Sequence, residues 1–383
     1  MTPSRFVWRI EGMTPGLGSR GCHGGWGALA WLWLVAWVAV VPCRAAPQGG
    51  SSSSHSSLEA IQKAVEAHPR DFSLRLALAN AELARHHPRR ALTEARQALS
   101  LATSPAEQAS ARTAIGLALL KTGDEAGAQR QWKAALSLNP KSGVAYFGLG
   151  EISLAEHRER EAAEDFTQAL RVAPTLEAAY VPLARLELRA GKGAEARQLL
   201  EKALSLNPSD WQAEFELAKL LARAGQAAKA TKMLQQVVAA QPEFAAAQAE
   251  LGLALLRQGD VAAAQKLASS LTADHPQDAA GHHLMALVFW KQGHLNAALE
   301  ECAEALAANP RSAAALVLQA IALWKEKHPR QAREVYQQAA KVDPRVGQAD
   351  ELCRLILCGS SDMGLVEDFL RKNRWALQPS NDP

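Results

Sequence analysis

The hexapeptide ALSLNP stands at residues 135–140 and again at residues 203–208, 68 positions further along the chain. Its closing proline belongs to a series with a spacing of 34 residues, namely Pro140, Pro174, Pro208, Pro242, Pro276, Pro310 and Pro344. A fixed period of this length indicates an array of small structural units stacked on one another, not a single globular core.

Two columns of small residues keep the same period. The residue 12 positions before each proline is alanine, as in Ala128 and Ala162, and the residue 24 positions before it is glycine or alanine, as in Gly116 and Gly150. Apolar residues three and four apart in each half of a unit predict two helices. Small residues let the helices approach where they cross, and large neighbours such as Phe166 fill the space beside them.

Glycine marks the turn between the two helices in five units, in KTGD, RAGK, RAGQ, RQGD and KQGH, which begin at residues 121, 189, 223, 257 and 291. Glycine supplies the left-handed residue that ends a helix, and the proline of each unit stops the second helix. Pro182 falls inside a first helix, where its missing N–H is expected to bend or shorten that helix.

Composition and charge agree with a helical array. Hydrophobic residues make up 48% of the 383 residues but aromatic residues only 5%. Alanine and leucine fill the difference, which favours helix over sheet. The formal charge is +3, and residues 1–45 carry four arginines and one glutamate, also +3, so the remainder is neutral (3 − 3 = 0). A neutral body argues against general binding to nucleic acid or to membrane surfaces.

On these columns the chain resembles the tetratricopeptide repeat family over residues 58–345, as a half unit followed by eight units of about 34 residues. The resemblance implies an all-α, right-handed superhelical solenoid of antiparallel helix pairs. Its concave groove, lined mainly by the first helices, is expected to take an extended peptide or a partner helix. After Pro344 the period is lost, and residues 346–383 are expected to form two capping helices (346–358 and 362–375) and a tail.

The N-terminal 45 residues have the layout of a secretory signal. Arginines precede an uncharged apolar run at residues 26–41, WGALAWLWLVAWVAVV, and Cys43-Arg44-Ala45 follows it. Cleavage after Ala45 would give a periplasmic or secreted protein, and retention would make the run a membrane anchor. Initiation at Met13 would give a signal of more usual length. Residues 46–57 are rich in Ser and Gly and are expected to be a flexible linker.

A row of basic residues stands 19 positions before the prolines. It comprises Lys121, Arg189, Arg223, Arg257, Lys291 and Lys325. Cations at these helix ends complement the helix dipole, which by itself explains the row. Arg185 and Lys219, one turn earlier than Arg189 and Arg223, extend it to a patch suited to an acidic peptide. In the alternative interpretation, Glu216 and Glu250 neutralise this patch.

Two tryptophans repeat at one position in neighbouring units. Trp290 and Trp324 are each followed by lysine, and His283 lies on the same predicted face as Trp290. Together they would offer an aromatic shelf for a peptide side chain or a sugar ring. The alternative is that they pack between repeat units.

Motifs for catalysis or metal binding are missing from the sequence. Cys302 falls on a core column, and Cys353 and Cys358 could form a disulfide only if their helix ends early, near Gly359. Because no second cysteine pair exists, we expect no zinc site. Without a phosphate loop, nucleophile elbow or HExxH motif, we expect no enzyme and no cofactor.

The sequence therefore predicts an exported, non-enzymatic protein-interaction scaffold of the cell envelope. The tentative site residues are Arg185, Arg189, Lys219, Arg223, Arg257, Lys291, Trp290, Trp324 and His283. The partner is expected to be a protein or peptide, acidic if the basic patch binds it. The alternative is an accessory component of a polysaccharide or protein export or assembly system that contacts glycan or machinery through the aromatic repeats. Nucleic acid is not expected, and a membrane only if the N-terminal segment is retained.

Overall fold

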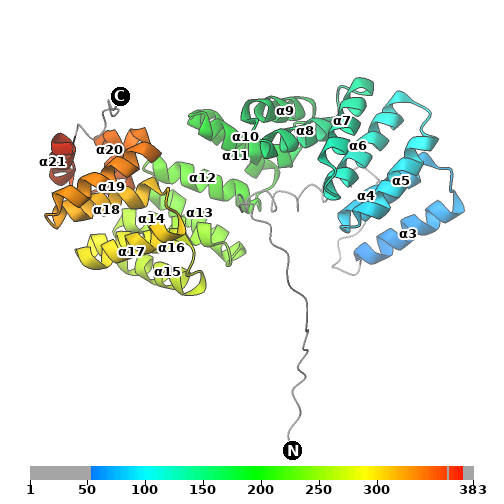
Figure 1. The fold of residues 1–383 in the computed structure, drawn as a ribbon. Helices are drawn as coiled ribbons and strands as arrows, with labels where there is room; N and C mark the ends of the chain where they lie inside the picture. Colours follow the sequence, from blue (N-terminus) through cyan, green and yellow to red (C-terminus); the bar gives the residue numbers. More distant parts are fainter. Residues whose placement is uncertain (1–52, 360–361, 374–383) are drawn as a thin grey trace, which may run out of the picture. The chain divides into compact units, whose positions relative to one another are not determined.

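The computed structural model describes residues 53–359 and 362–373. Within them the chain forms nineteen α-helices and two 3-10 helices, and no strand (Figure 1). The first helices of eight pairs are α4 (Phe72–Ala84), α6 (Pro105–Lys121), α8 (Gly143–Ala155), α10 (Tyr180–Arg189), α12 (Trp211–Arg223), α14 (Ala245–Gln258), α16 (Ala279–Gln292) and α18 (Ala313–Lys325). The second helices are α5 (Pro88–Leu101), α7 (Glu125–Leu138), α9 (Glu159–Val172), α11 (Gly193–Leu206), α13 (Ala227–Ala240), α15 (Val261–Asp274), α17 (Leu295–Ala308) and α19 (Pro329–Val342). The all-α fold of stacked helix pairs is thus confirmed.

The half unit predicted before the pairs is present as the single helix α3 (Ser53–Ala67). It begins inside the segment 46–57, so the linker is shorter at its C-terminal end than expected. The predicted signal segment 1–45 and the rest of the linker lie outside the described residues. None of the described helices is both long and apolar enough to cross a membrane.

Two compact units can be distinguished in the chain. The first extends to Pro140 and includes Glu151–His157, and the second comprises Lys141–Gly150 and everything from Arg158 onward. All nine predicted site residues fall in the second unit, which contains helices α9 to α21 (Met363–Asn373).

The small-residue columns work as predicted. A Cβ added to Gly116 would lie 2.4 Å from Nε1 of Trp132, and one added to Gly150 would lie 2.8 Å from Cε1 of Phe166. Both rings are fully buried. In the next two units alanine takes the small position and leucine the facing one, as in the pair Ala184 and Leu200, which share one apolar cluster. In these four units a smaller residue in the first helix therefore faces a larger one in the second.

The turns within the pairs adopt the left-handed conformation that the glycines predicted. Positive φ angles of 77–87° occur at Gly123, Gly191, Gly225, Gly259 and Gly293. At the same position of the period, His157 has φ 60° and Lys327 has φ 64° without being glycine. The architecture of the unit therefore imposes this conformation even on residues that disfavour it.

Pro182 shortens its helix, as predicted. A 3-10 turn at Glu177–Ala179 precedes α10, which is only 10 residues long. Pro182 thereby becomes the third residue of α10, where an N–H has no acceptor within the helix. The helix start has shifted so that the proline costs little.

The C-terminal helices are α20 (Ala349–Leu355), which is shorter than predicted, and α21 (Met363–Asn373), which reaches the end of the described residues. Helix α21 starts 34 residues after α19, so the period of helix starts continues beyond Pro344, which corrects the expectation that it ends there. Phe369 of α21 is fully buried, with its ring centroid 4.9 Å from that of Tyr336 and 5.6 Å from that of Trp324. The pair α20 and α21 is thus a truncated further unit that covers the last apolar face.

Candidate functional site

The basic residues predicted as a site lie on consecutive first helices of the second unit. Arg185 and Arg189 are on α10, Lys219 and Arg223 on α12, Arg257 on α14 and Lys291 on α16. Helix α10 contacts α12, α12 contacts α14, and α14 contacts α16. Stacking of the repeats therefore aligns six cations along neighbouring helices, each with different surroundings.

Glu216 neutralises the first two cations. Arg185 donates from Nε to Oε1 of Glu216 at 2.8 Å, and Lys219 donates from Nζ to Oε2 at 3.1 Å. Burial of this carboxylate, which is 4% exposed, would raise its pKa, but the charges of Lys219 and Arg185 outweigh burial and hold the pKa of Glu216 below its usual value. The alternative interpretation is therefore confirmed for Arg185 and Lys219, which compensate a buried charge.

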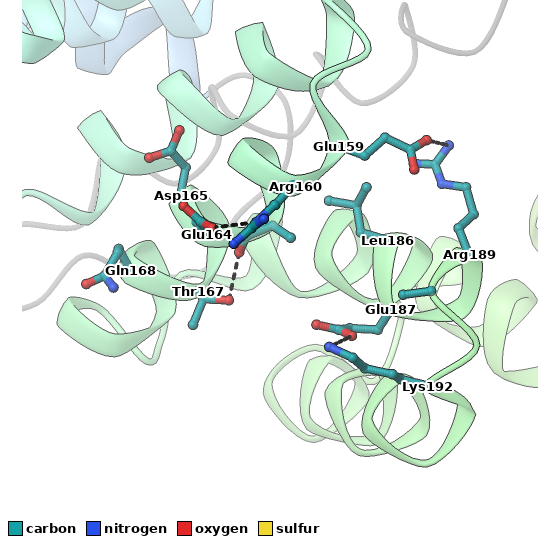
Figure 2. A pocket seen from close by; sticks show the side chains of 12 residues that line it. Glu159, Arg160, Glu164, Asp165, Thr167, Gln168, Leu186, Glu187, Arg189 and Lys192 are labelled. Carbon is teal, nitrogen blue, oxygen red and sulfur yellow. Dashed lines mark hydrogen bonds and ion pairs between the residues drawn. The ribbon is translucent and has the colours of Figure 1, made fainter.

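Arg189 is paired at the surface and borders a cleft. Its Nη1 lies 3.2 Å from Oε1 of Glu159, and both side chains are about half exposed. They line a cleft of about 820 Å³ between α9 and the end of α10 (Figure 2). Acidic residues in this cleft have basic neighbours, for example Glu187 with Lys192 at 3.0 Å. Exposed pairs of this kind are weak and exchangeable, and the mixed lining favours neither anions nor cations.

Arg223 and Arg257 have no hydrogen-bond or ion-pair partner among the described residues. Arg257 is half-buried, and its pKa is lowered by burial and by the charges of Arg354 and Arg223, although Glu250 acts in the opposite direction. Arg354 comes from α20 and is itself paired with Glu351, Nε to Oε2, at 2.8 Å. We call Arg223, Arg257 and Arg354 the arginine cluster. Burial and the two neighbouring arginines together outweigh the opposing charge of Glu250 at Arg257, whereas Arg354 has Glu351 as its partner.

Lys291 serves an internal role. Its Nζ donates to the backbone carbonyl of Leu357 and lies 3.8 Å from Oδ2 of Asp362. It thereby ties α16 to the connection between α20 and α21, so it is not available as a free cation.

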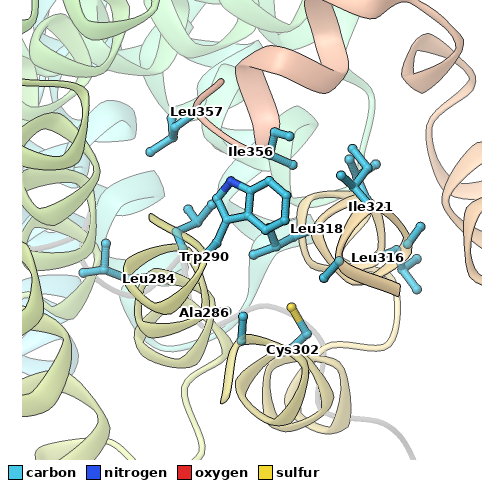
Figure 3. Close-up of a cluster of buried hydrophobic side chains, with 14 of the residues drawn as sticks. Leu284, Ala286, Trp290, Cys302, Leu316, Leu318, Ile321, Ile356 and Leu357 are labelled. Carbon is cyan, nitrogen blue, oxygen red and sulfur yellow. The ribbon is translucent and has the colours of Figure 1, made fainter. Parts of the chain in front are cut away.

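Trp290 does not form the predicted aromatic shelf. It is 3% exposed and belongs to the large apolar cluster of the C-terminal repeats. Figure 3 shows its indole enclosed near Ile356 and Leu357. Nζ of Lys325 lies 4.6 Å from the ring centroid. Packing between units, the alternative interpretation, therefore describes Trp290.

Trp324 and His283 are also engaged within the protein. Trp324 is half-buried against Phe369, and Nζ of Lys372 lies 5.6 Å from its ring centroid. Nδ1 of His283 is buried without a hydrogen-bond partner in the described part of the chain, and burial lowers the pKa of His283 to about 4. A neutral imidazole at physiological pH adds no charge to the basic row.

Sequence reasoning missed Arg354, Leu357 and Asp362, which reach the basic row from the truncated C-terminal unit. No periodic column marked them, because α20 has only 7 residues. The spacing of 34 residues between the starts of α19 and α21 is seen in the structure and not in the residue columns of the sequence.

Comparisons with known proteins address the family and the fold. A model of the tetratricopeptide repeat matches residues 153–213, 187–248, 221–288 and 289–356. A second model of the same description matches residues 113–177. No curated protein matches the chain.

Several solved structures are similar to the chain. The APC/C hetero-tetramer Cut9–Hcn1 has a TM-score of 0.53 and 20% identity, covering 70% of this chain and 52% of that chain. This chain thus spans about half the length of that relative. Pseudomonas aeruginosa pilF has a TM-score of 0.48 and 19% identity, covering 54% of this chain and 92% of its own. PilW, a type IV pilus biogenesis factor, has a TM-score of 0.45 and 24% identity, covering 54% of this chain and 95% of its own.

Cut9–Hcn1 shows the fold alone at this identity. The family models carry the assignment, because the first of them matches more than half of the chain, residues 153–356. The protein belongs to the tetratricopeptide repeat family.

Proposed function

We propose that this protein is a non-enzymatic scaffold of the cell envelope that binds an acidic peptide segment of a partner protein at the arginine cluster. Tetratricopeptide repeats in general form protein-interaction scaffolds, and the family match supports that role here. The apolar run at residues 26–41, with arginines before it, supports export to the periplasm or beyond, either cleaved or as an anchor.

The observation that carries the proposal is the difference between the cations of the basic row. Arg185 and Lys219 neutralise Glu216, and Lys291 is bound to the carbonyl of Leu357. Arg223 and Arg257 lack a hydrogen-bond or ion-pair partner among the described residues. Lys325 of the same row also lacks one, but its Nζ lies over the ring of Trp290.

A carboxylate would relieve two costs at the arginine cluster. It would supply hydrogen-bond acceptors to the half-buried guanidinium of Arg257, and it would screen the repulsion from Arg223 and Arg354. Guanidinium–carboxylate bonds are bidentate and among the stronger hydrogen bonds in proteins. An extended segment with two or three acidic side chains would reach both α12 and α14, which contact each other.

The test is the binding of a fluorescein-labelled octapeptide of Asp and Glu to the full chain, measured by anisotropy. A peptide of Asn and Gln serves as the neutral comparison. We expect Arg223→Ala/Arg257→Ala to weaken binding at least about tenfold, which corresponds to about 1.4 kcal/mol. We also expect the affinity of the unmodified protein to fall as salt is raised from about 0.05 to 0.5 M.

The matched control is Lys229→Ala/Lys232→Ala, which removes two exposed cations from α13. It changes the net charge equally but leaves the arginine cluster intact, so we expect nearly unchanged affinity. Equal losses in the two double variants would show that only overall charge matters. Equal binding of the acidic and neutral peptides would refute the proposal.

A further inference from the structure

Three sulfur atoms meet at the connection between α20 and α21. Cys353 lies in α20, Cys358 follows that helix and Met363 begins α21. Sγ of Cys353 lies 3.2 Å from Sδ of Met363. The thiol of Cys358 is near that of Cys353, since burial and the neighbouring Cys353 side chain both raise the pKa of Cys358. Cys353, Cys358 and Met363 are thus spaced five residues apart in the sequence, and the thioether of Met363 contacts the Cys353 thiol.

The backbone of this connection brings the sulfurs together. Helix α20 ends at Leu355, and Leu357 takes the left-handed conformation with φ 53°. The N–H of Cys358 donates to the carbonyl of Cys353 at 2.8 Å. The N–H of Gly359 donates to Oδ2 of Asp362 at 2.8 Å. The early helix end that a disulfide between the two cysteines would require is thus present, and in this structure both cysteines are free thiols.

The segment that carries the three sulfur atoms is held by a neighbouring helix, and one of its side chains is exposed to solvent. Lys291 of α16 holds the carbonyl of Leu357, which fixes the connection to a neighbouring repeat. Met363 is 37% exposed, which is unusual for a large apolar side chain in the described part of this chain. Its thioether is therefore reachable from solvent, whereas Cys302 is fully buried elsewhere in the core.

We propose that Cys353, Cys358 and Met363 form a binding site for a soft monovalent metal ion, Cu(I), with two thiolate ligands and one thioether ligand. Thiolates and thioethers select soft ions, and a thioether does not attract hard divalent ions. In the described part of the chain, no set of three or more His, Cys, Asp and Glu residues is placed to hold a metal ion. A zinc site was not expected because the sequence has no second cysteine pair. A Cu(I) site needs fewer ligands, and Met363 would supply the third sulfur.

The charges balance in a definite way. Binding replaces the two thiol protons with one Cu(I), releases two protons to solvent and leaves a net charge of −1 on the site. Lys291 lies close enough for its charge to act on Cys358 and offsets that negative charge. Burial raises the pKa of Cys358, so that thiol keeps its proton until the metal displaces it.

The test is a titration of the reduced full chain with Cu(I) under anaerobic conditions, in competition with the chromogenic chelator bicinchoninate. We expect one Cu(I) per chain and ultraviolet absorption from thiolate–Cu(I) charge transfer. Cys353→Ser and Cys358→Ser should each weaken binding about a hundredfold or more, and Met363→Leu about tenfold or more.

Two control variants remove sulfur elsewhere. Cys302→Ser removes the buried thiol, and Met233→Leu removes a partly buried thioether on α13; neither should change Cu(I) affinity. Met363→Leu decides the outcome even if a cysteine variant loses helicity by circular dichroism. Met363 is exposed, and leucine is similar in size to methionine, so this substitution should leave the fold intact. Unchanged affinity in Met363→Leu, or full binding in Cys353→Ser, would overturn the site and leave the two cysteines as a simple thiol pair.

Discussion

The contact between Gly116 and Trp132 should show energetic coupling that can be measured directly. Trp132 is fully buried, and its Nε1 donates to the carbonyl of Thr113 at 3.2 Å. The same array already contains a different pair of residues at this helix crossing, since the equivalent positions two units later are Ala184 and Leu200. The double variant Gly116→Ala/Trp132→Leu therefore copies a packing that this chain uses elsewhere.

The structure gives the expected magnitudes. Gly116→Ala places a methyl group 2.4 Å from the indole, far inside contact distance. Overpacking costs about 1–3 kcal/mol, and the better helix propensity of alanine returns about 1 kcal/mol. Trp132→Leu should cost about 2–4 kcal/mol because it leaves a void at a site without solvent access. In the double variant the methyl group fills part of that void, so we expect a favourable coupling of about 1–2 kcal/mol.

The assay is urea unfolding of the four proteins, combined with hydrogen exchange of the amides in α6 and α7. Exchange localises the effect, because repeat arrays can unfold one part at a time. Gly193→Ala is the matched control, since a Cβ there meets nothing within 4 Å. Its combination with Trp132→Leu should be additive. If Gly116→Ala/Trp132→Leu is also additive, the reasoning about paired columns is wrong.

Three further outcomes follow from other contacts. Lys327→Gly should stabilise the protein by about 0.5–1 kcal/mol, because Lys327 has the left-handed φ of 64°. The strain relieved in the folded state exceeds the entropy that glycine adds to the unfolded chain. An unchanged or lower melting temperature would contradict this. Burial lowers the pKa of His283 to about 4. Protonation of this histidine in the unfolded state should therefore remove about 3 kcal/mol of stability as the pH falls from about 6.5 to 4. The urea midpoint of His283→Leu should lack this loss, and a midpoint that still falls with pH would assign the loss to other groups. Glu216→Gln should destabilise the fold by about 1–3 kcal/mol. It should also strengthen binding of the acidic octapeptide, because Arg185 and Lys219 lose the carboxylate that they share. Weaker peptide binding with intact helicity would argue against electrostatic recognition.

Much of the fold could be predicted from the sequence because each repeat unit encodes its own packing. The glycine and alanine columns mark where helices cross, and the glycine turns mark where they end. Gly116 beside Trp132 and Gly150 beside Phe166 show this coding in the structure. The effect of Pro182 was also local, and the shortened α10 confirms it.

Features that depend on contacts between units were harder to predict. The left-handed turn at Lys327 arises without glycine, so its residue type gives no signal. The partner of Lys291 is the carbonyl of Leu357, 66 residues away and outside every column. The short helix α20, which ends two residues before Leu357, has too few residues for a periodic pattern.

The sequence predicted on which helices the basic residues lie but not what surrounds each of them. The sequence placed cations at the ends of the first helices and named Glu216 as a potential counter-charge. Which cations remain unpaired depends on side-chain geometry between stacked helices, as for Arg185 and Glu216, which lie 31 residues apart. Arg257 was therefore one residue of a row in the sequence, and the structure distinguishes it by its burial and by the proximity of Arg354.

The most direct test of acidic-segment recognition at Arg223 and Arg257 reverses the charge of the peptide and of these two residues. The measurement compares the affinities of the acidic octapeptide and of an octapeptide of lysines for the unmodified protein and for Arg223→Glu/Arg257→Glu, with circular dichroism to verify folding. If the arginine cluster recognises acidic segments, the unmodified protein prefers the acidic peptide and the variant prefers the basic one. If both proteins show the same preference, recognition does not occur at Arg223 and Arg257.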